Sequence, residues 1–162
     1  MRLLRHLFAP SAQRVFPAAA MDRIAEAVAE GERRHAGQVL FAVEPALHWR
    51  AVLAGTTPRR AAEDAFARLR AWDTEANNGV LLYLLLADRR IEIVADRGLR
   101  AVVEDAHWRA ICERMEGGLR TGDAEAAVTG AIGAISDLVA HHFPATAGRT
   151  TGNELPDRPQ IL

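Results

Sequence analysis

The stretch AWDTEANNGVLLYLLLADRRIEIVADRGL, residues 71–99, decides the fold. Its apolar run, residues 79–87, is typical of a buried strand, and the alternating run at residues 90–95 is typical of a half-buried strand. Only Asp88 and Arg89 need to separate the two runs. We therefore predict a β-hairpin whose turn is centred on Asp88-Arg89.

The position of this turn fixes which residues of the hairpin face each other, because the pairing register follows from the turn geometry. The predicted register pairs Gly79 with Gly98, Val80 with Arg97 and Leu81 with Asp96. Two facing glycines leave the backbone uncovered. Either a ligand or another segment of the chain can then approach closely.

Polar side chains gather at the end of the hairpin opposite the turn. They are Asp73, Glu75, Asn77 and Asn78 before the first strand, and Asp96 and Arg97 after the second. Carboxylate and amide oxygens are the ligands that Ca²⁺ and Mg²⁺ prefer. The oxygen-bearing side chains around the glycine gap are therefore a candidate metal site, and Glu75, Gly79, Arg97 and Gly98 are the predicted lining of a binding pocket.

The same residues are also typical of an ordinary turn. Asn-Asn-Gly before a strand is common turn chemistry, Asp73 can cap backbone amides, and Asp96 with Arg97 can form a local ion pair. The EF-hand pattern is incomplete here. Both interpretations remain open at the level of the sequence, and no cofactor is required by it.

The remaining elements place this hairpin in the α/β class. QVLFAVE, residues 38–44, predicts a further buried strand, and Thr57-Pro58 predicts the start of a helix that reaches about residue 71. Helices are also predicted near residues 19–35, 104–119 and 123–142. This order predicts a three-layer α/β/α sandwich with a small mixed sheet, in which the first two strands are parallel.

The two ends of the chain differ in character from this central part. Residues 1–18 form an N-terminal segment, whose short basic helix we expect to dock on its own domain rather than on a membrane, since one short segment binds lipid weakly. Residues 19–143 form the main domain. Residues 144–162 form an extended tail, and its last ten residues, NELPDRPQIL, suit docking on the same domain or on a partner.

Composition excludes several classes of function. The formal net charge is -1, which argues against nucleic-acid binding, and the 20 cationic side chains are all arginine, which excludes lysine chemistry. Arg5, His6 and Pro10 interrupt what would be the apolar centre of a signal peptide. The longest apolar run is too short to span a bilayer. We expect a cytoplasmic protein, without serine-hydrolase or zinc motifs.

The segment NNGVLLYLLLADRRIEIVADRGL resembles the TPM-domain family, and the resemblance extends from GQVLFAVE to the G-D-x-x-x-A-V segment, over about residues 20–143. With the NELPD tail, the chain is similar to a cytoplasmic bacterial branch that is often encoded beside LemA-type membrane proteins. The resemblance implies an α/β/α sandwich. Some exported relatives bind calcium at the loops flanking the hairpin, and the resemblance implies Asp73, Asn77, Asn78 and Asp96 as the comparable metal ligands of this chain. Plant relatives are linked to acid phosphatase activity and to maintenance of a membrane photosystem.

Two hypotheses about function follow. The first is a non-catalytic binding or scaffold module that assists a membrane-associated assembly, with a LemA-type protein or another TPM protein as partner and no assigned catalytic residue. The second is a metal-assisted phosphatase, in which Asp73 and Asp96 hold Ca²⁺ or Mg²⁺ and Arg97 neutralises the phosphate.

Overall fold

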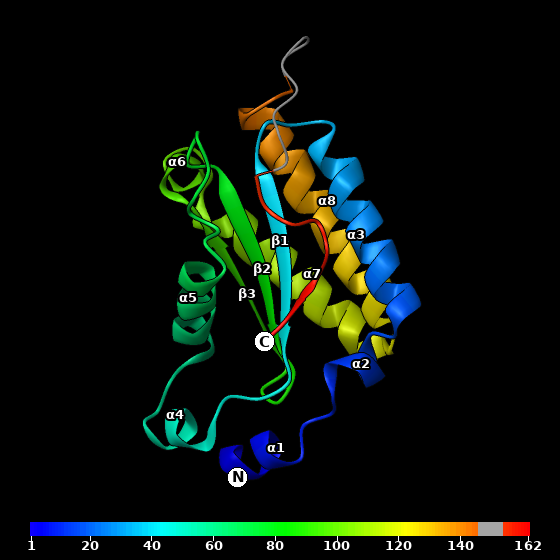
Figure 1. Ribbon diagram of the computed structural model, residues 1–162, viewed down its shortest axis with the longest axis vertical. Helices are drawn as coiled ribbons and strands as arrows, with labels where there is room; N and C mark the ends of the chain where they lie inside the picture. The colour runs from blue at the N-terminus through cyan, green and yellow to red at the C-terminus, as the bar shows by residue number, and fades with distance from the viewer. Residues whose placement is uncertain (146–153) are drawn as a thin grey trace.

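The computed structural model describes residues 1–145 and 154–162, which form a four-stranded open mixed sheet packed between helices (Figure 1). The strands are β1 (Gln38–Glu44), β2 (Gly79–Leu85), β3 (Arg90–Ala95) and β4 (Gln160–Ile161), in the order β3-β2-β1-β4. The helices are α1 (Arg2–Leu7), α2 (Ala12–Val15), α3 (Ala18–Glu32), α4 (Trp49–Leu53), α5 (Pro58–Arg68), α6 (Arg97–Arg100), α7 (Asp105–Thr121) and α8 (Ala124–His142). The predicted α/β/α sandwich is confirmed.

The sheet is covered on both faces because its central strands are apolar on both sides. Every residue of β2 is buried. In β1, Phe41 and Val43 pack in the cluster beneath α3, α7 and α8, whereas Leu40 and Ala42 pack in the cluster beneath α5 (Figure 1). Successive strand residues point to opposite faces, so two helical layers are needed to bury them. None of the described helices combines the length and apolar content that crossing a bilayer requires.

Local signals set several helix ends as predicted. Thr57 caps α5, since its Oγ1 accepts a hydrogen bond from the Arg60 amide at 3.1 Å, and Pro58 occupies the first helical position. α7 runs slightly beyond its predicted end near residue 119, and Gly122 ends it with a φ of 90°, in the left-handed region that favours glycine. β1 and β2 are parallel, as predicted, with Gln38 beside Gly79.

The predicted hairpin exists, but its register was wrong by two residues. β2 ends at Leu85 rather than at residue 87, and a four-residue turn, residues 86–89, places Val80 opposite Ala95 and Leu85 opposite Arg90. The cause is a contact distant in sequence. The Leu86 amide donates to Glu44 O at 3.0 Å and the Ala87 amide donates to Pro45 O at 3.0 Å, so both residues leave the ladder with β3.

The new register also changes the far end of the hairpin. Gly79 faces Asp96, whose amide donates to Gly79 O at 2.9 Å, rather than Gly98. β3 ends at Ala95, and Arg97 and Gly98 belong to the single-turn helix α6. Asp96 therefore caps a helix instead of continuing the strand.

Both ends of the described chain pack on the domain. In α1, Arg2 pairs with Asp88 of the hairpin turn, so the expected docking of the N-terminal helix on its own domain is observed. Residues 154–162 lie beside β1 and contribute β4, which is one of the two alternatives for the tail. The rest of the predicted tail, residues 146–153, lies outside the described residues.

We expect Gly79→Ala to lower the free energy of unfolding by about 1–3 kcal/mol, the usual cost of forcing extra atoms into a packed site. A Cβ at Gly79 would overlap the carbonyl oxygen of Ala71, which is backbone and cannot swing aside. Urea denaturation measures the change.

Gly130→Ala is the matched control, because a Cβ there meets no atom within 4 Å and the residue is exposed in α8. The better helix propensity of alanine should raise stability by about 0.5–1 kcal/mol. Equal stability of the two variants would contradict the close packing of Ala71 on Gly79.

Candidate functional site

We define the hairpin-end site as the eight residues that the sequence predicts for metal or ligand binding. They are Asp73, Glu75, Asn77, Asn78, Gly79, Asp96, Arg97 and Gly98. The loop before β2 and the helix α6 after β3 supply them, so they lie at the end of the sheet opposite the hairpin turn. Four of them, Asn77, Asp96, Arg97 and Gly98, are in direct contact with one another through hydrogen bonds.

Asp96 is the most buried acid of the site, with 8% of its surface exposed. Its Oδ1 accepts a hydrogen bond from the Arg97 amide at 2.7 Å, which caps α6. Its Oδ2 is buried and has no hydrogen-bond partner among the described residues. One carboxylate oxygen is thus available for a further donor or cation.

Asn77 and Arg97 join the two segments. Asn77 has a φ of 52°, a left-handed conformation that asparagine tolerates better than most residues, and its Oδ1 accepts from Arg97 Nε at 2.9 Å. Its carbonyl oxygen accepts from the Gly98 amide at 2.9 Å. A Cβ at Gly98 would lie 2.6 Å from that oxygen. The backbone at Gly98 is thus approached by the loop that carries Asn77. Approach of another chain segment, rather than of a ligand, was one of the two alternatives predicted for the glycines.

The remaining predicted residues serve other contacts. Asp73 Oδ2 pairs with Arg70 Nη2 at 2.6 Å on the surface, and Asn78 Nδ2 donates to Ala36 O at 3.0 Å. The Glu75 amide donates to Glu154 Oε2 at 2.9 Å. No hydrogen bond or ion pair within the described ranges joins Asp73 to Asp96.

The donor set offers limited room for a cation. Arginine nitrogens occupy Asn77 Oδ1 and Asp73 Oδ2, whereas Asp96 Oδ2 is a buried oxygen without a hydrogen-bond partner among the described residues. Among residues 1–145 and 154–162 there is no group of three or more His, Cys, Asp or Glu side chains arranged to hold a metal. A hard cation that takes Asn77 Oδ1 as a ligand would have to replace the Arg97 guanidinium there. Binding of Ca²⁺ or Mg²⁺ stays a prediction.

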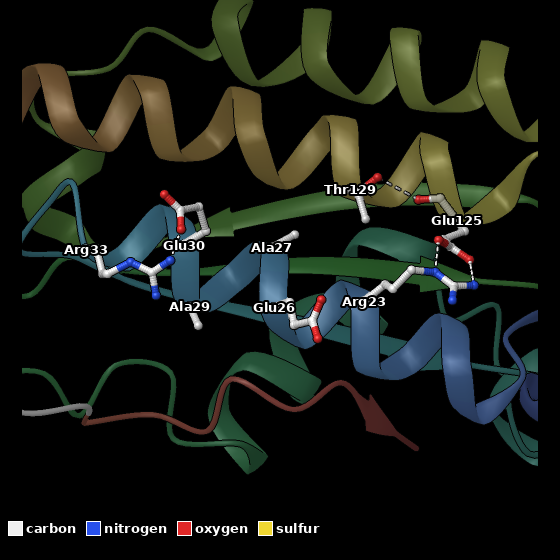
Figure 2. A pocket seen from close by; sticks show the side chains of 8 residues that line it. All are labelled: Arg23, Glu26, Ala27, Ala29, Glu30, Arg33, Glu125 and Thr129. Atoms are coloured by element: carbon white, nitrogen blue, oxygen red, sulfur yellow. Dashed lines mark hydrogen bonds and ion pairs between the residues drawn. The ribbon is translucent and has the colours of Figure 1, made fainter.

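A second surface feature is the groove between α3 and α8 (Figure 2). Four of its five charged side chains pair with one another: Arg23 contacts Glu125 across the groove, and Arg33 contacts Glu30 along α3. Thr129 Oγ1 donates to the Glu125 carbonyl at 3.0 Å. These pairs make the groove a solvated seam between two helices, and we assign it no ligand.

Sequence reasoning missed the residue that joins the site to the tail. Gln38 is 3% exposed, and its Oε1 accepts hydrogen bonds from the amides of Glu154 at 2.9 Å and Leu155 at 3.0 Å. The available signal was a glutamine at the start of an otherwise apolar strand, because a buried side-chain amide needs partners. The identity of those partners, more than 100 residues away, was not readable from the strand itself.

Comparisons with known proteins agree on the fold. The structure is similar to the NMR structure of the BA42 protein from the psychrophilic bacterium Bizionia argentinensis, with a TM-score of 0.79, 22% sequence identity, and coverage of 91% of this chain and 95% of that one. At this identity the likeness shows the fold alone. None of the curated proteins matches the chain.

The sequence itself matches a family model. The model of the TPM domain matches residues 11–138, which is well over half of the chain and includes the hairpin, α6 and most of α8. The resemblance noted from the sequence is therefore confirmed. The chain belongs to the TPM domain family.

Proposed function

We propose that this chain is a non-catalytic binding module that assists a membrane-associated protein assembly from the cytoplasm, and that the edge of β1 binds an extended segment of its partner. One observation carries the proposal: the chain lays its own residues 154–162 along that edge. Strand addition at a sheet edge is a common mode of peptide recognition, in which main-chain hydrogen bonds give affinity and side-chain sockets give specificity.

The main-chain part of this contact is a short parallel ladder. Gln160 lies beside Ala42 and Ile161 beside Val43, and the Leu162 amide donates to Val43 O at 3.1 Å. Two ladder positions make a small interface, so the backbone alone holds the segment weakly. An extended segment of another protein can form the same bonds with β1.

Side chains at the start of the segment add specificity. Leu155 is 6% exposed and packs in the cluster beneath α5, while Gln38 Oε1 accepts hydrogen bonds from the backbone amides of Glu154 and Leu155. Pro159 is also buried, whereas Ile161 is 45% exposed. We therefore expect this edge to favour an extended partner segment with a leucine and a proline spaced as Leu155 and Pro159 are.

A carboxyl pair holds the middle of the segment. Burial raises the pKa of the Glu32 carboxyl to about 8, and the nearby Asp157, which hydrogen-bonds with it, raises it too. Glu32 Oε1 also accepts from the Val39 amide at 2.8 Å, which favours the ionised form. The contact between α3 and the tail is thus made by a protonated acid, and deprotonation would place two negative charges together.

We expect a labelled peptide of residues 154–162 to bind the full-length variant Leu155→Asp at least ~100-fold more tightly than the wild type. In the wild type the attached tail occupies β1 at a high effective concentration, and burying a charge in the Leu155 socket should release it. Fluorescence anisotropy measures the affinities.

Ile161→Asp is the control, because this side chain is exposed in the same C-terminal segment and its replacement should leave the tail in place. For the partner itself, a co-expressed LemA-type membrane protein should co-purify in larger amount with Leu155→Asp than with Ile161→Asp. Equal recovery with both variants would count against partner binding at β1.

We expect the free energy of unfolding to fall as the pH rises from about 6.5 to about 8, above the range in which the pKa of the buried His35, lowered to about 4, gives the opposite slope. In this window the folded chain keeps the Glu32 proton that the unfolded chain has released, so the unfolded state is favoured progressively as protons become scarce. Glu32→Gln stays neutral and should flatten the dependence, as measured by urea denaturation at several pH values.

Glu30→Gln provides the comparison, since Glu30 lies on the same helix with its side chain 63% exposed and pairs with Arg33. Its pH dependence should follow the wild type. A slope that persists in Glu32→Gln would remove the carboxyl pair as its origin.

Metal-assisted phosphatase activity is a second candidate, and the unpartnered Oδ2 of Asp96 favours it. If this oxygen takes a cation, millimolar Ca²⁺ or Mg²⁺ should raise the Tm of the wild type. Asp96→Asn keeps an oxygen for the α6 cap and removes the charge, so the rise should vanish. If the cation raises the Tm of both proteins equally, or of neither, Asp96 does not hold a metal, and the phosphatase hypothesis is contradicted.

A further inference from the structure

The N-terminal helix α1 docks with its polar face inward. Arg2 Nη2 lies 2.7 Å from Asp88 Oδ2, and His6 Nε2 lies 3.2 Å from Asp88 Oδ1. His6 Nδ1 accepts from the Leu47 amide at 3.0 Å, and His6 is 6% exposed. Burial alone would raise the pKa of Asp88, but the hydrogen bonds and charges of Arg2 and His6 hold it below its ordinary value. An ionised Asp88 thus fixes the orientation of the helix.

This orientation turns the apolar stripe of α1 toward solvent. Met1, Leu4, Leu7 and Phe8 follow helical spacing, and Leu4 is 54%, Leu7 61% and Phe8 82% exposed. A surface helix ordinarily buries such a stripe against its own core. Large exposed apolar patches mark surfaces that meet another molecule or a membrane.

The neighbouring helix α4 enlarges this surface. It packs against α1 at the same end of the molecule (Figure 1), and Trp49 and Leu53 are 47% and 65% exposed. We call Met1, Leu4, Leu7, Phe8, Trp49 and Leu53 the end patch. One short helix binds lipid weakly, but here two neighbouring helices present their apolar side chains on one surface.

The charges around the end patch are predominantly positive. Arg2 and Arg5 both contact Asp88, Arg50 lies over the Trp49 ring at 5.2 Å, and Arg89 lines a groove with Leu4 and Phe8. Of these four arginines, Arg2 and Arg5 are paired with the carboxylate of Asp88. The excess of positive charge stands out on a chain whose formal net charge is -1.

We propose that the end patch docks on the surface of a lipid bilayer that contains anionic headgroups. Leucine, phenylalanine and tryptophan suit the boundary between headgroups and acyl chains, and arginine suits anionic headgroups. A second copy of the chain fits the patch less well, because a two-fold contact would bring the arginines of both copies together. This docking does not use the β1 edge and stands independently of partner binding there.

The test is flotation of the full chain with vesicles of phosphatidylcholine, with and without phosphatidylglycerol. We expect binding to the anionic vesicles, weaker binding at high salt, and a blue shift of Trp fluorescence that Trp49→Phe removes. Leu7→Glu and Phe8→Glu change exposed side chains and should each lower the partition coefficient by roughly tenfold or more. Circular dichroism confirms that the variants stay folded.

Trp72→Glu is the matched control, because Trp72 is 49% exposed and lies 5.8 Å from the Arg70 guanidinium, as Trp49 does near Arg50, but precedes β2 at the other end of the sheet. It should bind vesicles as the wild type does, and Trp49→Glu should not. Absence of wild-type binding, an equal loss in Trp72→Glu, or a dimer that Phe8→Glu dissociates without any lipid binding would each overturn the proposal.

Discussion

The burial of β2 on both faces is the constraint on which the rest of the structure depends. Seven consecutive apolar or glycine residues are completely enclosed, so each face of the sheet needs a layer of helices. The Tyr83 side chain shows how strict this enclosure is: its only polar atom is hydrogen-bonded to Glu44 Oε2 at 2.5 Å. The parallel pairing with β1 and the antiparallel pairing with β3 then follow from a strand that must be paired along both edges.

The two outer edges of the sheet are protected in different ways. At β3, the outward carbonyl of Ile93 accepts from Arg59 Nη1 at 2.7 Å, so a side chain covers the edge. At β1, the C-terminal segment covers the edge with backbone. Uncovered edges invite pairing with other chains, and natural proteins cover them. A cover made of a terminal segment can be exchanged more readily than one made by a helix side chain, which is why the proposed binding edge is β1 rather than β3.

The sequence predicts what is local and leaves out what is distant. Helix caps such as Thr57 and strands such as β1 follow from neighbouring residues, and they are found as predicted. The hairpin register failed because Leu86 and Ala87 bond to Glu44 and Pro45, about forty positions earlier. The error was an even number of residues, so every side chain still points to the predicted face of the sheet.

The same division applies to the hairpin-end site. A hairpin with either the predicted or the observed register brings Asn77 close to Arg97, and this contact is observed. The ion pair of Asp73 with Arg70 was one of several pairings that nearby residues allowed, so the sequence did not single it out. The hydrogen bonds of Gln38 with the tail join residues 116 and 117 positions apart. No pattern within β1 specifies those partners. Likewise, an apolar stripe in α1 predicts a helix that buries it, but Asp88 in the turn reverses the orientation through a contact 86 positions away.

Attachment of α1 to the hairpin turn has a mechanical consequence. Asp88 ties the N-terminal helix to the tip of β2, and β2 runs from there through the domain to the loop that carries Asn77. Seven residues of strand span roughly 23 Å. In a molecule bound to a membrane through its α1–α4 end, β2 would separate the bilayer surface from α6. Asp96, which caps α6, would then face the aqueous phase, where a soluble or peripheral protein could reach it.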